Sequence, residues 1–223
     1  MALMALIVGA RAWLQENPQH NPWAPLDLTH PVGWATGAKL ATLRSDPAEC
    51  RAVLSRSGLS FDELEPADNA EAACKRPDRL ILDETRLSPD TPQTTCPVAA
   101  AYAGWMEHVI QPAARDILGS SIVRVEHLGA YNCRRLYGRS EGGWSEHATG
   151  NAIDIAAFVA ADGHRVEVLS GWSGDEAQHE FLRAVRDGAC LWFGTVLSPD
   201  YNAAHADHLH LDQADRAFGT TCR

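Results

Sequence analysis

Two short stretches of the chain carry side chains of the types that hold a metal ion. Residues 145–154 read S-E-H-A-T-G-N-A-I-D, and residues 205–212 read H-A-D-H-L-H-L-D. Two imidazoles and a carboxylate match what zinc accepts when a water keeps the fourth coordination position. A lone His-x-His is usually coincidence, but the Ser-x-His-x-x-Gly-x-Ala-x-Asp pattern upstream of it favours a metal site.

Both stretches alternate as strands do and lack the periodicity of a helix. A Gly-Asn pair interrupts the first stretch, and residues 152–156 then alternate apolar and polar positions. The two isoleucines on either side of Asp154 therefore face the core, and Asp154 points away from it. In the second stretch the two leucines turn inward, which leaves three polar side chains on the opposite face: His208, His210 and Asp212.

None of the six cysteines lies within either stretch, so a closed, cysteine-rich structural zinc site is not indicated. The even number of cysteines favours disulfides and export to an oxidising compartment. The sequence does not fix how the cysteines pair. Their order and their positions relative to the motifs suggest the pairs Cys50–Cys74, Cys96–Cys133 and Cys190–Cys222.

Several separated motifs occur in an order that resembles a known family. The motifs are A-Y-N-C-R at 130–134, S-E-H-A at 145–148, G-N-A-I-D-I at 150–155 and H-A-D-H-L-H-L-D at 205–212. From about Cys50 to Cys222 the chain resembles the bacterial extensin-like C-terminal domain family. It is also similar to the zinc D-Ala-D-Ala metallopeptidases and their lysostaphin and hedgehog relatives.

The resemblance implies one Zn²⁺ per chain, held by His147, Asp154 and His210. Zinc acidifies its bound water and polarises a scissile carbonyl. Asp207 lies three residues before His210, where the relatives carry the acid that takes the proton of the water. His208 shares the face of His210 and is expected to stabilise the tetrahedral intermediate without ligating.

An arginine that follows a tyrosine in the metallopeptidases binds substrate or steadies the developing oxyanion. Arg134 is the corresponding candidate here, although Cys133 intervenes. Two further arginines remain alternatives: Arg135 and Arg139. Two side chains are expected to orient the ligands through hydrogen bonds: Ser145 and Asp212. Two others could also enter the site: Glu146 and His205.

The chain divides into an N-terminal segment, residues 1–37, and one extensin-like domain, residues 38–223. Residues 1–10 are almost wholly apolar, but they are too few to span a bilayer, which needs about 20 residues. They are either the end of a signal or membrane anchor, or a short helix packed on the domain. A Pro- and Trp-rich lead-in follows. We expect an exported protein, periplasmic or anchored in the membrane and facing the periplasm.

Helical patterns occupy the first part of the domain. Two helices are expected within residues 39–57. A longer helix starts near 94–97, with proline at an early position, and runs to Pro112, and a second helical piece over 113–118 ends at Gly119. A capping box at 173–176 predicts a further helix that runs to Gly188.

Strand patterns surround the proposed ligands. Residues 122–128 are rich in branched side chains, and a turn at 162–163 predicts a hairpin whose second strand covers 165–169. Helices packed on a small, largely antiparallel sheet that carries the His/Asp/His site make an α+β fold. The resemblance implies the same fold.

Composition excludes some partners. Hydrophobic residues at 45% and charged residues at 22% are typical of a soluble globule. A formal charge of −10 argues against nucleic acid or an anionic membrane surface as a partner. The sequence does not indicate an oligomeric state.

By resemblance, the expected activity is zinc-dependent hydrolysis of peptidoglycan stem peptides or other peptides with D-amino acids, as a D,D-carboxypeptidase or endopeptidase. The alternative is a zinc-stabilised cell-wall-binding or interaction module without turnover, which would not need Asp207 and His208. Iron held by two His and a carboxylate is a third hypothesis. Its usual pattern places the His and the carboxylate closer together than His147 and Asp154.

Overall fold

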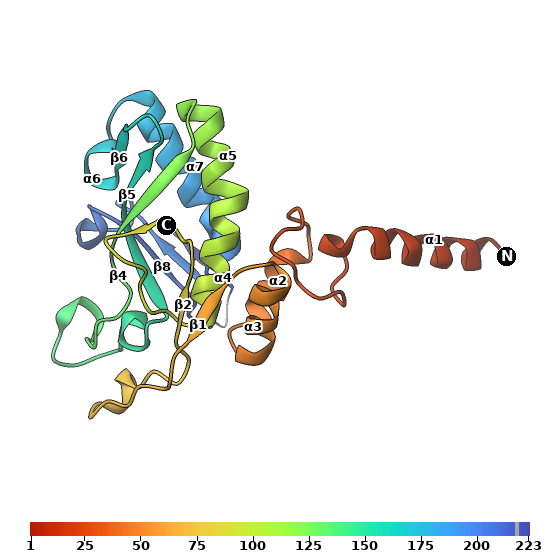
Figure 1. The fold of residues 1–223 in the computed structure, drawn as a ribbon, viewed down its shortest axis with the longest axis horizontal. Coiled ribbons are helices and arrows are strands. Elements are labelled where there is room, and N and C mark those ends of the chain that lie inside the picture. Colours follow the sequence, from red (N-terminus) through yellow and green to blue (C-terminus); the bar gives the residue numbers. More distant parts are fainter. Residues whose placement is uncertain (217–218) are drawn as a thin grey trace.

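Helices and a mixed sheet form an α+β body, from which the N-terminal helix extends (Figure 1). The computed structural model describes residues 1–216 and 219–223. The helices are α1 Ala2–Glu16, α2 Thr36–Thr42, α3 Pro47–Arg56, α4 Cys96–Trp105, α5 Gln111–Ala113, α6 Val168–Gly171 and α7 Glu176–Trp192. The strands are β1 Phe61–Glu63, β2 Leu80–Leu82, β3 Leu87–Ser88, β4 Ile122–Gly129, β5 Ala152–Ala160, β6 Arg165–Glu167, β7 Thr195–Leu197, β8 Leu209–Asp212 and β9 Thr221–Cys222.

The main sheet is mixed. Among the described residues it has the order β3-β4-β5-β8-β7-β9, with β6 also paired to β5. The expectation of a small, largely antiparallel sheet is wrong, because β3 pairs with β4 and β7 pairs with β9 in parallel. The chain leaves β3, passes through α4 and α5, and only then enters β4, and a crossover of this kind joins parallel strands.

The core lies between the sheet and the long helices α4 and α7, which lie side by side in Figure 1. Trp105 is fully buried, and its indole N–H donates to the Val185 carbonyl at 2.8 Å. Phe158 of β5 packs edge-on against Trp105. Gly104 of α4 allows α7 to pack closely, since a Cβ there would lie 2.0 Å from the Trp192 ring. Ile153 and Ile155 of β5 belong to the same core, so Asp154 between them lies on the opposite face of the strand.

The helix from α4 continues through α5 and two π-helical segments, Met106–Ile110 and Ala114–Leu118, where the sequence predicts two separate pieces. It ends at Gly119 with φ 67°, as the sequence predicts. The hairpin differs from its prediction. Its second strand, expected over 165–169, stops at Glu167, where α6 follows directly.

Helix α7 also differs from its predicted form. Asp175 caps it instead of Ser173, since the Asp175 carboxylate accepts from the Gln178 backbone N–H at 3.0 Å. The helix does not end at Gly188. That glycine lies within the helix, where a Cβ would come 2.3 Å from Val109 on the neighbouring helix.

All six cysteines form disulfides. The Cys190–Cys222 pair is confirmed, but the pairs Cys50–Cys74 and Cys96–Cys133 are wrong. The structure pairs Cys50 with Cys96 and Cys74 with Cys133. The reason is helix packing, since α3 packs against α4 and brings Cys50 to the first residue of α4.

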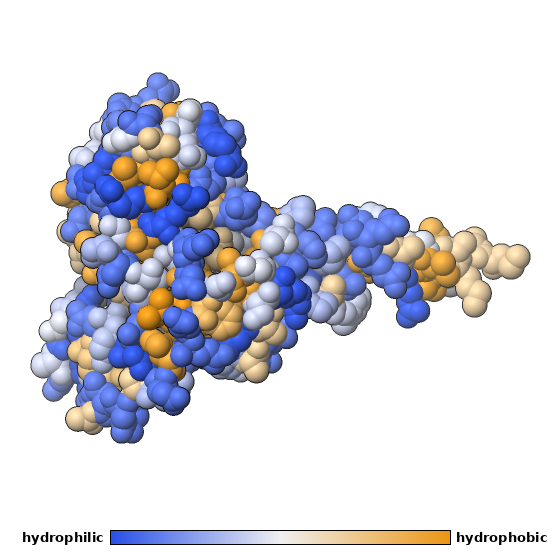
Figure 2. Space-filling model, viewed as in Figure 1, coloured by the Kyte–Doolittle hydropathy of each residue, from blue (hydrophilic) through white to orange (hydrophobic). Residues whose placement is uncertain are grey.

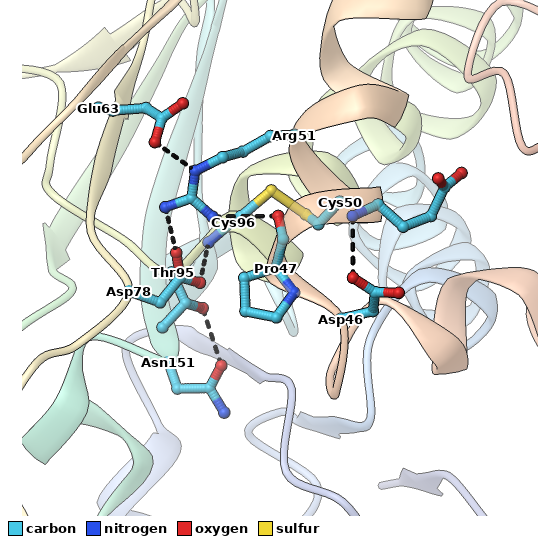
Figure 3. Close-up of a disulfide and its surroundings, with 10 residues drawn as sticks. Asp46, Pro47, Cys50, Arg51, Glu63, Asp78, Thr95, Cys96 and Asn151 are labelled. Carbon is cyan, nitrogen blue, oxygen red and sulfur yellow. Dashed lines mark hydrogen bonds and ion pairs between the residues drawn. A yellow bond between two sulfur atoms is a disulfide. The ribbon is translucent and has the colours of Figure 1, made fainter.

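A polar network surrounds the Cys50–Cys96 disulfide and leads toward the sheet (Figure 3). Arg51 donates to Glu63 and Asp78, and the second Asp78 oxygen accepts from the Cys96 backbone N–H at 2.8 Å. Thr95 then donates to the Asn151 side chain at 2.8 Å. The start of α4 is therefore tied to the residue that precedes β5.

Helix α1 carries the apolar N-terminal residues. Met4, Leu6 and Val8 are all exposed, so these side chains do not pack on the domain. Trp13 at the end of the helix stacks on His20, which stacks in turn near Trp34. No helix among residues 1–216 and 219–223 has the length and apolar character needed to cross a bilayer.

Candidate metal centre

The structure brings His147, Asp154 and His210 to a single point. Asp154 and His210 are direct partners in the antiparallel register of β5 and β8. Asp154 Oδ1 lies 2.9 Å from His210 Nδ1 and 3.1 Å from His147 Nε2, and the two imidazole nitrogens are 3.1 Å apart. All three side chains are largely buried.

His147 reaches this point from a short 3-10 helix, Glu146–Thr149, just before β5. Ser145 caps that helix, with its hydroxyl accepting from the His147 backbone N–H at 3.3 Å. Gly150 ends it with φ 75°, a left-handed conformation that favours glycine. The Ser-x-His-x-x-Gly part of the motif therefore supplies the helix cap Ser145, the candidate ligand His147 and the helix end at Gly150.

Hydrogen bonds on the far sides of the imidazoles set their orientation. His147 Nδ1 lies 3.0 Å from the Ala130 carbonyl, which can only accept, so the proton is assigned to Nδ1 and Nε2 keeps a lone pair. His210 Nε2 lies 3.0 Å from Asp212 Oδ2, which likewise leaves His210 Nδ1 facing the cluster. Asp212 is itself held by the Ala214 backbone N–H at 2.9 Å.

Three atoms with lone pairs, Asp154 Oδ1, His147 Nε2 and His210 Nδ1, thus lie 2.9–3.1 Å from one another. Lone pairs this close repel, so the arrangement needs a positive charge between them. Zinc bonds of about 2.0–2.1 Å at a tetrahedral angle separate ligand atoms by about 3.3 Å, close to the spacing present. The donor set therefore fits a zinc ion with room for a water. Among the described residues, these three side chains form the one group of His, Cys, Asp or Glu whose ligand atoms are close enough to share an ion.

A proton on His210 is the other way to supply that charge. Burial disfavours the imidazolium, but the Asp154 and Asp212 carboxylates outweigh it and raise the pKa of His210 to about 9. Burial likewise opposes ionisation of Asp154, yet hydrogen bonds from His147 and His210 hold the pKa of Asp154 well below its usual range. The two carboxylates thus favour a positive charge at the cluster.

His208 also lies beside the cluster. Its Nε2 lies 3.6 Å from Asp154 Oδ1, and its Nδ1 lies 2.8 Å from Asp207 Oδ1. Asp207 is on the outer side of His208, and its side chain is 57% exposed. The two residues therefore form a hydrogen-bonded pair in which the imidazole, and not the carboxylate, is next to the proposed ligands.

A pocket of about 330 Å³ opens over the cluster. Arg134 lines it, whereas Arg135 stacks on Trp144 and Arg139 lies over Tyr137. Arg134 is thus the one of the three candidate arginines that is directed to the pocket.

The remaining candidates have partners already. Glu146 lines the pocket but accepts from the Asn151 amide at 2.7 Å. His205 bonds Asn202 at 2.8 Å, and burial together with the neighbouring His208 and His210 lowers the pKa of His205 to about 4. His205 is therefore neutral at pH 7.

Sequence reasoning missed Arg216 in the same pocket. Its Nε donates to the Thr195 hydroxyl at 2.8 Å, and its Nη2 lies 3.9 Å from Asp212 Oδ2. It follows the last motif by several residues, and no spacing or neighbouring pattern marks it. Its contact with Asp212 makes it part of the environment of His210.

Comparison with known proteins adds one match. The family model described as extensin-like protein C-terminus matches residues 48–223. No curated protein and no solved structure matches the chain.

Proposed function

The chain belongs to the extensin-like protein C-terminus family, and from this premise we propose that it is a zinc-dependent peptidase. The observation that carries the proposal is the convergence of His147, Asp154 and His210 beside the hydrogen-bonded pair of His208 and Asp207. The proposed substrates are peptidoglycan stem peptides or other peptides with D-amino acids. The similarity of the motifs to the zinc D-Ala-D-Ala metallopeptidases supports that substrate class.

Zinc at this cluster would lower the pKa of a bound water to about 7 and polarise the scissile carbonyl. The protein residues supply the proton transfers. The Asp207 carboxylate accepts from His208 Nδ1–H, so His208 Nε2, which faces Asp154, is free to act as a base. It would take the proton of the attacking water and later give it to the leaving amine. We therefore propose that Asp207, expected from the motif to be the base, acts through His208.

Arg134 supplies positive charge on the wall of the pocket. A guanidinium there can bind a substrate carboxylate or the negative charge that develops on the carbonyl oxygen. Ser145 and Asp212 orient His147 and His210 and need not touch the substrate. Each residue of the proposed mechanism thus has a separate task.

The three disulfides indicate an oxidising compartment and an exported protein. We propose that the compartment is the periplasm, where peptidoglycan is accessible. The exposed apolar side chains of α1 are consistent with association of that helix with a membrane.

The direct test is digestion of purified muropeptides by the zinc-loaded protein, with products identified by mass spectrometry. Loss of a terminal D-amino acid or cleavage of a cross-link is expected, and a chelator should stop it. His208→Ala is the matched control, since it should keep zinc and lose most turnover. A wild-type protein that binds zinc but cleaves no muropeptide would favour the cell-wall-binding module.

A further inference from the structure

A second hollow of about 430 Å³ lies on the side of Asp207 away from the cluster. Strands β4, β5 and β6 form its floor and walls, and these strands lie side by side in Figure 1. In the space-filling view, apolar atoms bordered by hydrophilic ones lie over the region of β5 and β6 (Figure 2). The proposed function leaves this hollow without a role.

The hollow continues from the cluster along β5. Ala156 lies in its floor and follows Asp154 by two residues, at the point where the pairing of β5 with β4 shifts register between Ile155 and Ala157. Strand spacing up to this bulge puts both side chains on the same side of β5, about 7 Å apart. An extended peptide has the same spacing between alternate residues. If the scissile bond of a peptide substrate lies at the cluster, a neighbouring substrate residue would lie over Ala156. The small side chain of Ala156 leaves space for it.

The charges around the hollow favour a cation. Carboxylates of Glu126, Glu167 and Asp207 line it, together with the guanidinium of Arg165. Arg165 lies 2.8 Å from Glu126 and 3.1 Å from Glu167, and Arg124 lies 3.3 Å from Glu126. Three carboxylates against these two guanidiniums leave one carboxylate charge in excess. An ammonium group bound there would be attracted by that excess.

A buried acceptor in the same wall has no partner. His127 lines the hollow with a side chain only 5% exposed, and its Nε2 lies 2.9 Å from the Asp90 carbonyl. That bond requires the proton on Nε2, so Nδ1 is an acceptor, and it has no hydrogen-bond partner within the described residues. Buried acceptors are normally satisfied, so the wall is suited to a ligand that donates.

Two apolar side chains also line the hollow. Leu128 and Leu169 line the hollow and are more than half exposed. A long aliphatic side chain with an ammonium tip matches such a surface, because its methylene groups pack on apolar walls while its charge meets carboxylates.

We propose that this hollow is a substrate subsite for a residue with an aliphatic side chain that ends in an ammonium group. The inference rests on the proposed peptidase function. The peptide then contacts the protein on two sides of the cluster, with Arg134 in one pocket and Glu167 in the other hollow. A substrate whose amine is acylated loses the attraction to the carboxylates.

Two synthetic peptides test the subsite: Nα-acetyl-L-Lys-D-Ala-D-Ala and the same peptide with an acetylated side-chain amine. The zinc-loaded wild-type protein should cleave the free amine with a kcat/KM about five- to tenfold higher, as one partly exposed charged contact implies. Glu167→Gln should reduce that preference. Glu180→Gln, an exposed change on α7, is the charge-matched control and should leave it intact.

Ala156→Trp should fill the floor and lower kcat/KM for both peptides while zinc content stays unchanged. Equal kcat/KM for the two peptides in wild type, unaltered in Glu167→Gln, would overturn the subsite even if the enzyme is active. If wild type cleaves neither peptide, the peptidase proposal fails, and binding decides the subsite separately.

Binding is measured on ¹⁵N-labelled, zinc-loaded wild-type protein titrated with each peptide. Amide shifts at Ala156, Arg165 and Glu167 that occur only with the free amine support the subsite. Shifts that are absent, or identical with the acetylated peptide, contradict it.

Discussion

The two walls of the metal pocket are built in contrasting ways. The ligand wall stands on β5 and β8, where backbone pairing fixes Asp154 opposite His210 and both are 9% exposed. The other wall is the loop 131–145, whose side chains are mostly exposed. It contains Tyr137 at φ 57°, an uncommon conformation for a residue other than glycine. The disulfide Cys74–Cys133 ties its beginning.

The contrast separates the wall that must hold atoms precisely from the wall that can change shape. A metal site needs ligand atoms held to within fractions of an ångström, and strand register supplies that. Substrate contacts can come from a loop whose shape adjusts on binding. Changes in the ligand wall should therefore alter metal binding, whereas changes in the loop should alter substrate binding alone.

The largest effect is expected from His147→Ala, which removes one ligand from the fixed wall. Zinc content should fall from about one ion per chain to near zero, and cleavage should be lost with it. Metal analysis after dialysis measures this. Tyr137→Phe in the loop is the control and should retain zinc, whereas full occupancy in His147→Ala would refute the ligand assignment.

The next effect concerns proton transfer. His208→Ala should keep zinc and lose about 10²–10⁴-fold in kcat, the usual contribution of general acid–base catalysis. Asp207→Ala should fall in the same direction because it leaves His208 Nδ1 without its carboxylate. Steady-state kinetics with a D-amino-acid peptide measures both. If Asp207→Ala cleaves as well as wild type, His208 does not depend on Asp207. If His208→Ala also cleaves as well, Glu146 or His205 becomes the next candidate base.

A smaller effect is expected at the hydrogen bond behind His210. Asp212→Asn should weaken zinc affinity by about 10- to 100-fold, because residues that orient ligands commonly contribute that much. Competition with a zinc chelator gives the affinity. Asp215→Asn, at an exposed position on the same pocket, is the matched control. Equal affinity in both variants would mean that Asp212 does not support the ligand.

The smallest effect should come from the loop. Arg134→Lys keeps the charge but loses the bidentate geometry, so KM should rise by roughly tenfold with zinc affinity unchanged. Arg135→Lys should have less effect, since Arg135 stacks on Trp144 and does not itself line the pocket. A loss of zinc in Arg134→Lys would contradict the separation between the two walls.

The same contrast explains what the sequence could predict. The alternation around Asp154 and His210 sets the faces of β5 and β8, because side chains of a strand point alternately to its two sides. The α+β class and the helix that ends at Gly119 follow from equally local signals. Ligand convergence was therefore predictable from short patterns.

Features that depend on packing between distant segments were not predictable. Cys50 pairs with Cys96 because α3 packs on α4, which no spacing of cysteines reveals. Strands β3 and β9 are two residues long and carry no periodic pattern, so the parallel pairs of the sheet were missed. Arg216 enters the pocket from a segment without a motif.

The central claim is that one zinc ion binds to two imidazoles and a carboxylate. X-ray absorption spectroscopy of the zinc-loaded protein, at one equivalent of metal, tests it most directly. We expect only nitrogen and oxygen ligands at about 2.0–2.1 Å, with the outer-shell scattering of two imidazoles. Sulfur scattering at about 2.3 Å, or failure of the wild-type protein to retain zinc, would contradict it.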